Sequence, residues 1–150
     1  MGKQKVLQMI GTGWNELLVS MEGLSDRTLE KKRDSGDWSI KDILGHVTTW
    51  ESEALKYLPI IVRGERPSSY RREYGGIDSF NALQTQQKAK LPIAQILDDF
   101  HATHDRLVAY LESVPEEYFT SGTRFLRRLG WDTFKHYPEH TRAILEQKNG

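Results

Sequence analysis

The stretch from Ser39 to Val62 carries one long helical pattern of apolar side chains, and it constrains the fold more than any other part of the sequence. Ser39 can cap a helix, and Asp42 places a carboxylate against the exposed N–H groups of the first turn. The apolar side chains that recur at helical spacing are Ile40, Ile43, Leu44, Val47, Trp50, Ala54, Leu58 and Ile61. The stretch therefore predicts an amphipathic helix whose last turn is bent or ended by Pro59, near Arg63.

Two further segments in the first two thirds of the chain show the same spacing. The segment from Lys3 to about Gly23 has an apolar face, on which Gly11 and Gly13 lower the helix propensity but allow a neighbouring helix to approach closely. A shorter helix is expected to begin with Asp78 as its cap and to run to Lys90.

The last third of the chain predicts two more helices. Pro92 suits the first turn of one helix, and a clear apolar stripe follows it. A loop is expected over residues 120–130, in which Arg124 to Arg128 form a solvated basic cluster. Asp132 can cap the final helix, but Pro138 removes a backbone donor about one turn in, so this helix either starts after Asp132 or kinks. Its inward-facing side chains are expected to be Phe134, Tyr137, Thr141, Ile144 and Leu145.

Two polar connections separate the helices. Residues 24–36 contain one short helical turn at Ser25-Asp26-Arg27, and residues 65–77 form a long crossover with one proline, two serines and two glycines. Tyr70 and Tyr74 in the crossover either line the mouth of a pocket or only cover the surface. Because no alternating strand pattern and no internal repeat is present, the sequence predicts an all-α bundle of four main helices.

Size and charge restrict the classes of function. The 150 residues suffice for a single domain, residues 1–150, and Lys plus Arg balance Asp plus Glu at 21 each. We therefore expect no general attraction to nucleic acid or to an anionic membrane. No apolar run has membrane-spanning length, and the N-terminus lacks the apolar core of a signal peptide, which favours a cytoplasmic protein. The chain has no cysteine, so a disulfide, a thiolate nucleophile and a sulfur-rich metal site are excluded.

Three histidines are candidates for a metal site, although a pair of histidines four residues apart also occurs on helices by chance. His136 and His140 are four residues apart, so on a continuous helix both rings project from one side and can share one divalent ion. His46, at the edge of the apolar face of another helix, is the best candidate for a third ligand. Three neutral imidazoles leave positions for water or substrate, which is typical of a reactive metal site.

Three other side chains are candidates for contact with a substrate. Glu53 and Tyr57 follow His46 along the same edge of its helix and either reach a substrate or act as a solvated carboxylate and a packing residue. His104 lies within an apolar stripe, where a hydrogen-bonded core histidine is the default interpretation. The alternative is that His104 acts as a general base or as a partner of a metal ligand.

Two motifs carry a family resemblance. The segment WSIKDILGHV, from Trp38 to Val47, is followed by Trp50-Glu51, and the segment HYPEH spans residues 136–140. Together they resemble the DinB-like family of bacterial DNA-damage-inducible-type helical proteins, which includes thiol-dependent transferases and relatives that confer self-resistance to colibactin. The resemblance covers nearly the whole chain in order. It implies an up-up-down-down bundle, a divalent cation, often nickel or zinc, on the three histidines named above, and a tendency to form homodimers.

Three functions follow as hypotheses. The first is an enzyme in which a metal lowers the pKa of a bound water or thiol, for hydrolysis of a reactive compound or for transfer of a thiol to it in detoxification or stress response. Because the chain has no cysteine, that thiol comes from a low-molecular-weight cosubstrate such as bacillithiol or mycothiol. The second is a metal-free protein that sequesters a small molecule in the same cleft. The third is a structural dimer without chemistry.

Overall fold

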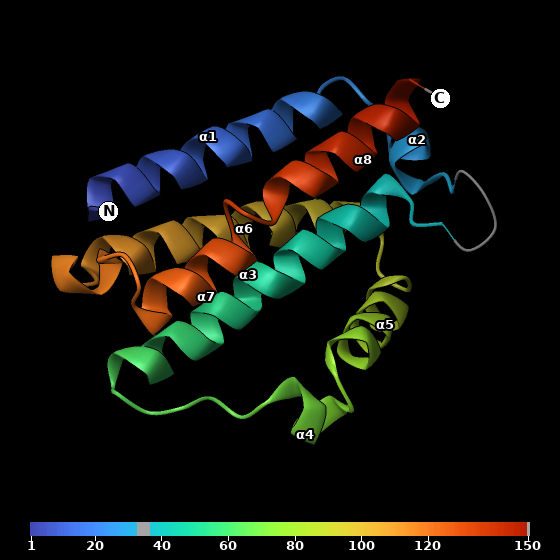
Figure 1. Ribbon diagram of the computed structural model, residues 1–150. Helices are drawn as coiled ribbons and strands as arrows, with labels where there is room; N and C mark the ends of the chain where they lie inside the picture. The colour runs from blue at the N-terminus through green and yellow to red at the C-terminus, as the bar shows by residue number, and fades with distance from the viewer. Residues whose placement is uncertain (33–36, 150) are drawn as a thin grey trace.

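Every regular element in the part of the chain that the computed structural model describes, residues 1–32 and 37–149, is a helix (Figure 1). The four longest are α1, α3, α6 and α8, which form the expected four-helix bundle. In chain order the elements are α1 (Lys3–Met21), α2 (Asp26–Glu30), α3 (Ile40–Val62), α4 (Tyr70–Tyr74), α5 (Ile77–Lys88), α6 (Ile93–Ser113), the 3₁₀ helix η1 (Glu116–Phe119), α7 (Arg124–Asp132) and α8 (Tyr137–Asn149).

Contacts at the helix ends fix the direction of each long helix. α1 begins where α6 ends, since Lys3 Nζ donates a hydrogen bond of 2.8 Å to the carbonyl oxygen of Val114. α8 ends where α3 begins, since Gln147 Nε2 donates a hydrogen bond of 2.9 Å to the carbonyl oxygen of Trp38. Figure 1 shows α3 and α6 running in the same sense. The directions along the chain are therefore up, down, down, up.

The all-helical bundle that was expected is confirmed, but the up-up-down-down order that the family resemblance implied is wrong, because α1 and α3 run in opposite directions. The long crossover over residues 63–92, which contains α4 and α5, returns the chain to the end of the bundle where α3 began. It therefore joins two parallel helices. The connection between α1 and α3 makes no such return, and so these two helices are antiparallel.

α3 begins where the sequence predicts. Ser39 Oγ accepts a hydrogen bond from the backbone N–H of Asp42, and the Asp42 carboxylate accepts one from the backbone N–H of Ser39, each at 3.0 Å. This reciprocal pair satisfies two of the donors that a helix start leaves open. The helix continues past Pro59 to Val62, because burial of Leu58 and its neighbours outweighs the one backbone hydrogen bond that proline removes.

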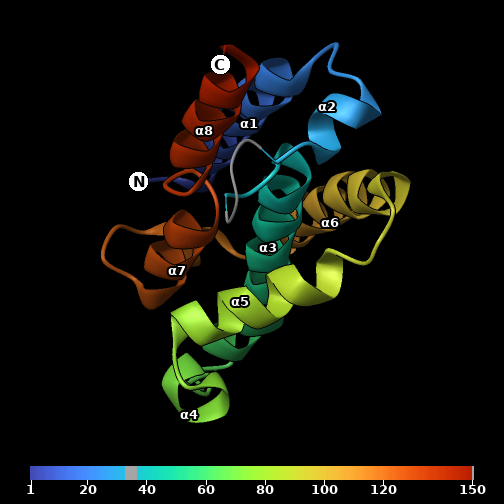
Figure 2. The ribbon, with the colours of Figure 1, turned by 90° about the vertical axis from the view of Figure 1, so that its right-hand side faces the viewer.

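The crossover differs from expectation at the start of α5. Gly76, with φ of 126°, precedes the helix in place of the expected cap Asp78, which lies within the first turn. The positive φ is accessible to glycine, while the carboxylate still faces the positive end of the helix dipole. α5 packs across α3 near the end where α3 begins (Figure 2), and Trp50 Nε1 donates a hydrogen bond of 2.9 Å to Asn81 Oδ1.

The connection between α1 and α3 contains the expected short helical turn. Ser25 caps α2, accepting a hydrogen bond from the backbone N–H of Thr28 at 3.2 Å. Leu29 of α2 is buried in the core, so this connection contributes to the packing of the bundle. Residues 33–36 of the expected polar connection lie outside the described residues.

The expected loop over residues 120–130 is wrong, because α7 occupies most of it. Thr123 Oγ1 caps α7 by accepting a hydrogen bond of 3.1 Å from the backbone N–H of Leu126. Phe125 and Leu129 are buried, and their burial stabilises the helix. The apolar spacing was hard to recognise in the sequence because three arginines interrupt it.

α8 starts later than the first possible cap. Asp132 is the last residue of α7, not the cap of α8, and α8 begins at Tyr137. Pro138 therefore lies in the first turn, where a backbone N–H would have no acceptor within the helix, so proline costs no hydrogen bond there. Tyr137 and Ile144 face inward as expected, whereas Leu145 is 40% exposed. None of the described helices has both the length and the apolar character of a membrane span.

Close contact between α1 and α8 depends on a glycine. A Cβ atom built on Gly13 would lie 2.9 Å from Cδ2 of Tyr137, whose ring is fully buried, while one built on Gly11 would meet nothing within 4 Å. Gly13 therefore permits the approach that the sequence left as a possibility, and Gly11 does not serve it.

We expect Gly13→Ala to lower the free energy of unfolding by about 1–3 kcal/mol, because Tyr137 has no space into which to move. The matched variant Gly11→Ala should raise it by about 0.5–1 kcal/mol through the higher helix propensity of alanine. Urea unfolding of both variants measures the difference. Equal effects of the two substitutions would show that Gly13 is not a packing requirement.

Candidate metal centre

Three imidazole rings from two distant parts of the sequence meet at one point. The Nε2 atom of His136 lies 3.1 Å from Nε2 of His46 and 2.9 Å from Nε2 of His140. The ligand nitrogens of all three rings lie within 4.8 Å of one another. The structure thus brings together the three histidines that the sequence singled out.

The local fold explains how the rings converge. His46 lies in the second turn of α3, where the indole of Trp38 packs against it with ring centroids 4.7 Å apart. His136 lies in the turn before α8, where its backbone N–H donates a hydrogen bond of 2.8 Å to Thr133. His140 follows one turn later on α8, so the spacing of four residues places both rings on one side.

Burial keeps these rings neutral. Burial, followed by the effect of the two other rings and Lys88, lowers the pKa of His46 to about 3. Burial and the neighbouring His140 lower the pKa of His136 to about 3 as well. The pKa of His140 is lowered by burial, while the nearby carboxylate of Glu139 acts in the opposite direction. At neutral pH the three rings are therefore electron-pair donors.

The donor set fits a divalent cation. Two nitrogens that bind one ion at about 2.1 Å in tetrahedral or octahedral geometry are about 3.0–3.4 Å apart. Two of the three Nε2 separations are close to this range, at 2.9 Å and 3.1 Å. A neutral imidazole still carries one N–H, so N–H···N hydrogen bonds can join these rings, whereas a divalent cation can accept a lone pair from each of the three.

One carboxylate stands beside the rings. Glu139 Oε1 lies 3.7 Å from Nε2 of His140 and 4.0 Å from Nε2 of His136, and its side chain is 65% exposed. Because this side chain is free to rotate in solvent, it can offer a further oxygen donor or accept a proton at the open side of the site.

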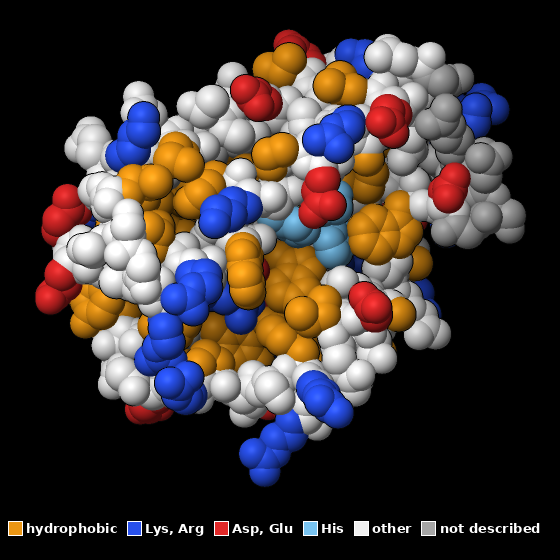
Figure 3. Space-filling view, viewed as in Figure 1, with side chains coloured by type: hydrophobic (Ala, Val, Ile, Leu, Met, Phe, Trp, Pro, Cys, Tyr) orange, Lys and Arg blue, Asp and Glu red, His pale blue; other side chains and the backbone are white. Residues whose placement is uncertain are grey.

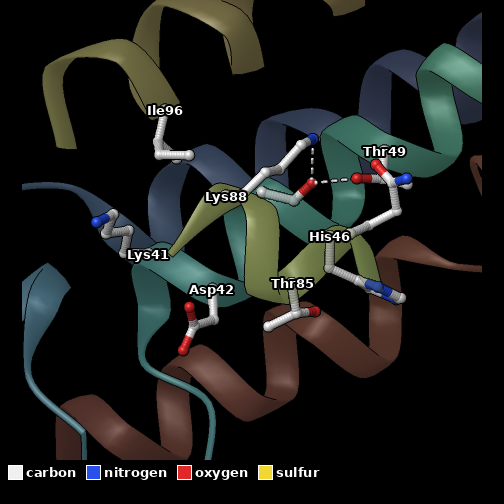
Figure 4. A pocket seen from close by; sticks show the side chains of 9 residues that line it. Lys41, Asp42, His46, Thr49, Thr85, Lys88 and Ile96 are labelled. Carbon is white, nitrogen blue, oxygen red and sulfur yellow. Dashed lines mark hydrogen bonds between the residues drawn. The ribbon is translucent and has the colours of Figure 1, made fainter. Parts of the chain in front are cut away.

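Two cavities of very different volume border the histidine rings. A cavity of about 10 Å³ behind His46, large enough for about one water, is bounded by Lys88, whose Nζ donates a hydrogen bond of 2.9 Å to Gly45 (Figure 4). Figure 4 shows the His46 ring directed away from this amine. Burial lowers the pKa of Lys88 to about 8. A larger hollow of about 380 Å³ is lined by Trp38, Glu139 and His140, among others.

The histidines reach the surface of the protein. Figure 3 shows them beside a hollow lined by hydrophobic side chains, with Lys and Arg side chains along one rim. Aromatic contacts between α3 and the crossover are continuous: the ring of Tyr70 on α4 lies 5.3 Å from Trp50 and 5.8 Å from Tyr57, centroid to centroid. A small molecule can therefore approach the rings over an apolar surface.

Glu53 and Tyr57 lie in a polar network on this side of α3. Tyr70 donates a hydrogen bond of 3.1 Å to Glu53, and the guanidinium of Arg128 lies 4.8 Å from the ring centroid of Tyr57. Tyr57 is buried, as a packing residue would be. In the described part of the chain, these contacts run to α4 and α7, and none of them involves the three histidines.

The sequence predicted that Arg128 is a solvated surface residue, and the structure contradicts this prediction. Its side chain is 16% exposed, and it donates a hydrogen bond of 2.6 Å to Asp132 and another of 2.6 Å to the hydroxyl of Tyr70. Burial raises the pKa of Asp132 to about 7, although Arg128 acts against this shift. The spacing of four residues between Arg128 and Asp132 is the sequence signal that could have identified this pair.

His104 occupies the environment of a hydrogen-bonded core histidine. Its Nδ1 lies 3.1 Å from Oε1 of Glu51, and its ring stacks on Trp14 with centroids 3.6 Å apart. Glu51 was missed by the sequence analysis. The signal was present, because Glu51 falls at helical spacing between Val47 and Ala54 on the face that is otherwise apolar.

Comparison with known proteins agrees with the motifs. The sequence profile of the DinB superfamily matches residues 9–143, which confirms the resemblance. The fold is similar to that of a crystal structure of a protein from Streptococcus pneumoniae, with a TM-score of 0.83 and 13% identity over 99% of this chain and 91% of that one. No protein among the curated sequences matches the chain.

Two further solved structures are similar over 99% of this chain and 96% of theirs. One is the sibling lethal factor precursor DfsB, with a TM-score of 0.80 and 14% identity. The other is the colibactin self-resistance protein ClbS in complex with double-stranded DNA, with a TM-score of 0.78 and 12% identity. At these identities the likeness shows the fold alone.

In metal-free protein, we expect the buried histidine rings to make the free energy of unfolding decrease as the pH is lowered. The folded pKa values of His46 and His136, each about 3, lie below the ordinary 6.5, so below about pH 6.5 the unfolded chain takes up protons that these two folded rings do not. Each ring then lowers the free energy of unfolding by up to about 1.4 kcal/mol per pH unit. Urea unfolding in chelator between about pH 7 and about pH 5 measures this slope.

His46→Gln supplies the control for this prediction. Asp132, whose pKa is raised, acts with the opposite sign over the same range and is present in both proteins, so the difference between the two slopes isolates the imidazole. The slope should be shallower in His46→Gln. Identical slopes would contradict the neutral state of His46 in the folded protein.

Proposed function

This chain belongs to the DinB superfamily, and we propose that it is a metal-dependent enzyme that transfers a thiol to a reactive small molecule or hydrolyses such a molecule. The proposal assigns the divalent ion, nickel, zinc or manganese, to His46, His136 and His140. The observation that carries it is the convergence of three neutral Nε2 atoms, with ligand nitrogens within 4.8 Å of one another, next to a solvent-facing apolar hollow.

A bound divalent ion supplies Lewis acidity, which lowers the pKa of a water or a thiol at neutral pH. The chain's own residues supply the surroundings. Trp38 packs against His46 and restricts water on that side, while the turn at Thr133 orients His136 through a backbone hydrogen bond. Glu139 stands on the open side, where its carboxylate can accept a proton from an incoming nucleophile.

The aromatic contacts between α3 and the crossover indicate the kind of substrate. Aromatic faces of Trp50 and Tyr70 favour an apolar or conjugated body, and Glu53 is the carboxylate on this side of α3 that we assign to contact with the substrate. Tyr57 is assigned the role of supporting this wall through its contact with Arg128. A thiol must come from a cosubstrate, because the chain has no cysteine.

The alternative function is metal-free sequestration of a small molecule, which the hollow of about 380 Å³ beside Trp38 and His140 would accommodate. The complex of ClbS with double-stranded DNA is a property of that protein. The zero net charge of the present chain favours a small-molecule ligand over nucleic acid.

We expect protein purified without a histidine tag to bind one equivalent of Ni²⁺, Zn²⁺ or Mn²⁺ per chain, because the three rings are neutral and converge. Elemental analysis after supply of each ion and gel filtration measures the content. His46→Ala should lose at least about tenfold in affinity while keeping its helical circular dichroism.

His101→Ala is the matched control, because that histidine lies on α6, is exposed, and is not in the cluster. It should bind the ion as the original protein does. If the original protein binds no stoichiometric ion, or if His46→Ala binds it equally well, the enzymatic proposal fails and sequestration becomes the better explanation.

Glu53→Gln should lower kcat/KM for the metal-loaded protein by about tenfold or more without loss of metal, because the substitution removes a carboxylate from the substrate wall. Consumption of a low-molecular-weight thiol in the presence of an alkylating electrophile provides the assay. Glu22→Gln, an exposed substitution at the end of α1, is the matched control. Equal effects of both substitutions would remove Glu53 from the site.

A further inference from the structure

A carboxylate is buried at the centre of the bundle. Glu51 is 1% exposed and lies on the core-facing side of α3. A buried carboxylate is costly unless hydrogen bonds compensate for the lost water. The proposed metal-dependent chemistry does not use Glu51 directly, so its presence in the core requires another explanation.

Glu51 has two partners from two other helices. Its Oε1 and Oε2 atoms lie 3.1 Å and 3.2 Å from Nδ1 of His104 on α6. The hydroxyl of Tyr137, the first residue of α8, donates a hydrogen bond of 2.5 Å to Oε2. A short hydrogen bond to a buried carboxylate is among the stronger polar contacts in proteins.

Both partners are themselves fixed by α1. The ring of His104 stacks on Trp14 at 3.6 Å with an angle of 2° between the planes, and Trp14 also contacts Tyr137 with centroids 5.8 Å apart. Tyr137 packs so closely against Gly13 that a Cβ there would clash. The carboxylate therefore accepts its hydrogen bonds from groups with little freedom to move.

The bond from Tyr137 to Glu51 joins the two chain segments that carry the histidines. Glu51 follows His46 by five residues on α3, and Tyr137 directly follows His136. We propose that Glu51 is a positioning residue: by accepting the hydroxyl of Tyr137 it fixes the start of α8 against α3 and so sets the distance between His46 and the HYPEH segment. This inference rests on the proposed function for its metal readout, and on the metal-free protein for a second one.

Removal of this bond should loosen the histidine cluster without unfolding the bundle. Tyr137→Phe keeps the ring and removes only the hydroxyl, and Glu51→Leu removes the acceptor. Glu51→Gln should keep most of the positioning role of Glu51. The amide oxygen can accept a hydrogen bond from Tyr137, and the amide N–H can donate one to Nδ1 of His104 in its other tautomer. Leu111→Ala, which opens a cavity near the far end of α6, is a control for general loss of stability.

Two measurements test the proposal. One is the Kd for Zn²⁺ by competition with a chromophoric chelator, and the other is hydrogen–deuterium exchange of the backbone amides at residues 136–140 in metal-free protein. Tyr137→Phe and Glu51→Leu should raise the Kd by about tenfold or more and accelerate exchange in this segment. Glu51→Gln should stay within about threefold in both. Leu111→Ala should lower Tm without changing Kd.

The outcomes separate the two proposals. If the original protein binds none of Zn²⁺, Ni²⁺ and Mn²⁺, the proposed function fails, but faster exchange at residues 136–140 in Tyr137→Phe would still support the positioning role. If Tyr137→Phe leaves exchange in this segment unchanged, or if its effects on Kd and exchange equal those of Leu111→Ala, Glu51 is a packing residue and the inference is overturned.

Discussion

Burial of imidazole at the junction of α3 and α8 is the constraint on which the candidate site depends. Water would protonate or separate the rings of His46, His136 and His140, whereas the bundle holds them together as neutral bases. The cost of removing these polar groups from water is met by the core that surrounds them, not by bonds among the rings. The site is therefore a property of the packed bundle and not of either histidine-bearing segment alone.

Local signals in the sequence predicted several parts of this arrangement. The start of α3 could be predicted because Ser39 and Asp42 act within one turn, and the spacing of His136 and His140 defines one side of a helix wherever that helix lies. These inferences depend on residues a few positions apart. They hold without knowledge of the tertiary structure, and the position of His46 at the edge of an apolar helix face, together with the family resemblance, identified it as the third histidine.

Other parts could not be predicted, because they depend on partners distant in the sequence. Arg128 looked solvated until α7 packed it against Tyr70 of the crossover, and Asp132 looked like a helix cap until Arg128 paired with it. Glu51 sat visibly on an apolar face, but its partners come from two other helices. Likewise, the order of helix directions depends on where the crossover returns the chain, and no local pattern records that.

The hydroxyl of Tyr70 joins three elements, because it donates to Glu53 on α3 and accepts from Arg128 on α7 while belonging to the crossover helix α4. A segment that contributes no imidazole to the cluster thus joins the polar network between α3 and α7. The crossover network and the histidine cluster therefore draw on separate segments of the chain. Changes in the length or composition of residues 65–77 would alter the surface beside α3 and leave the three histidines in place.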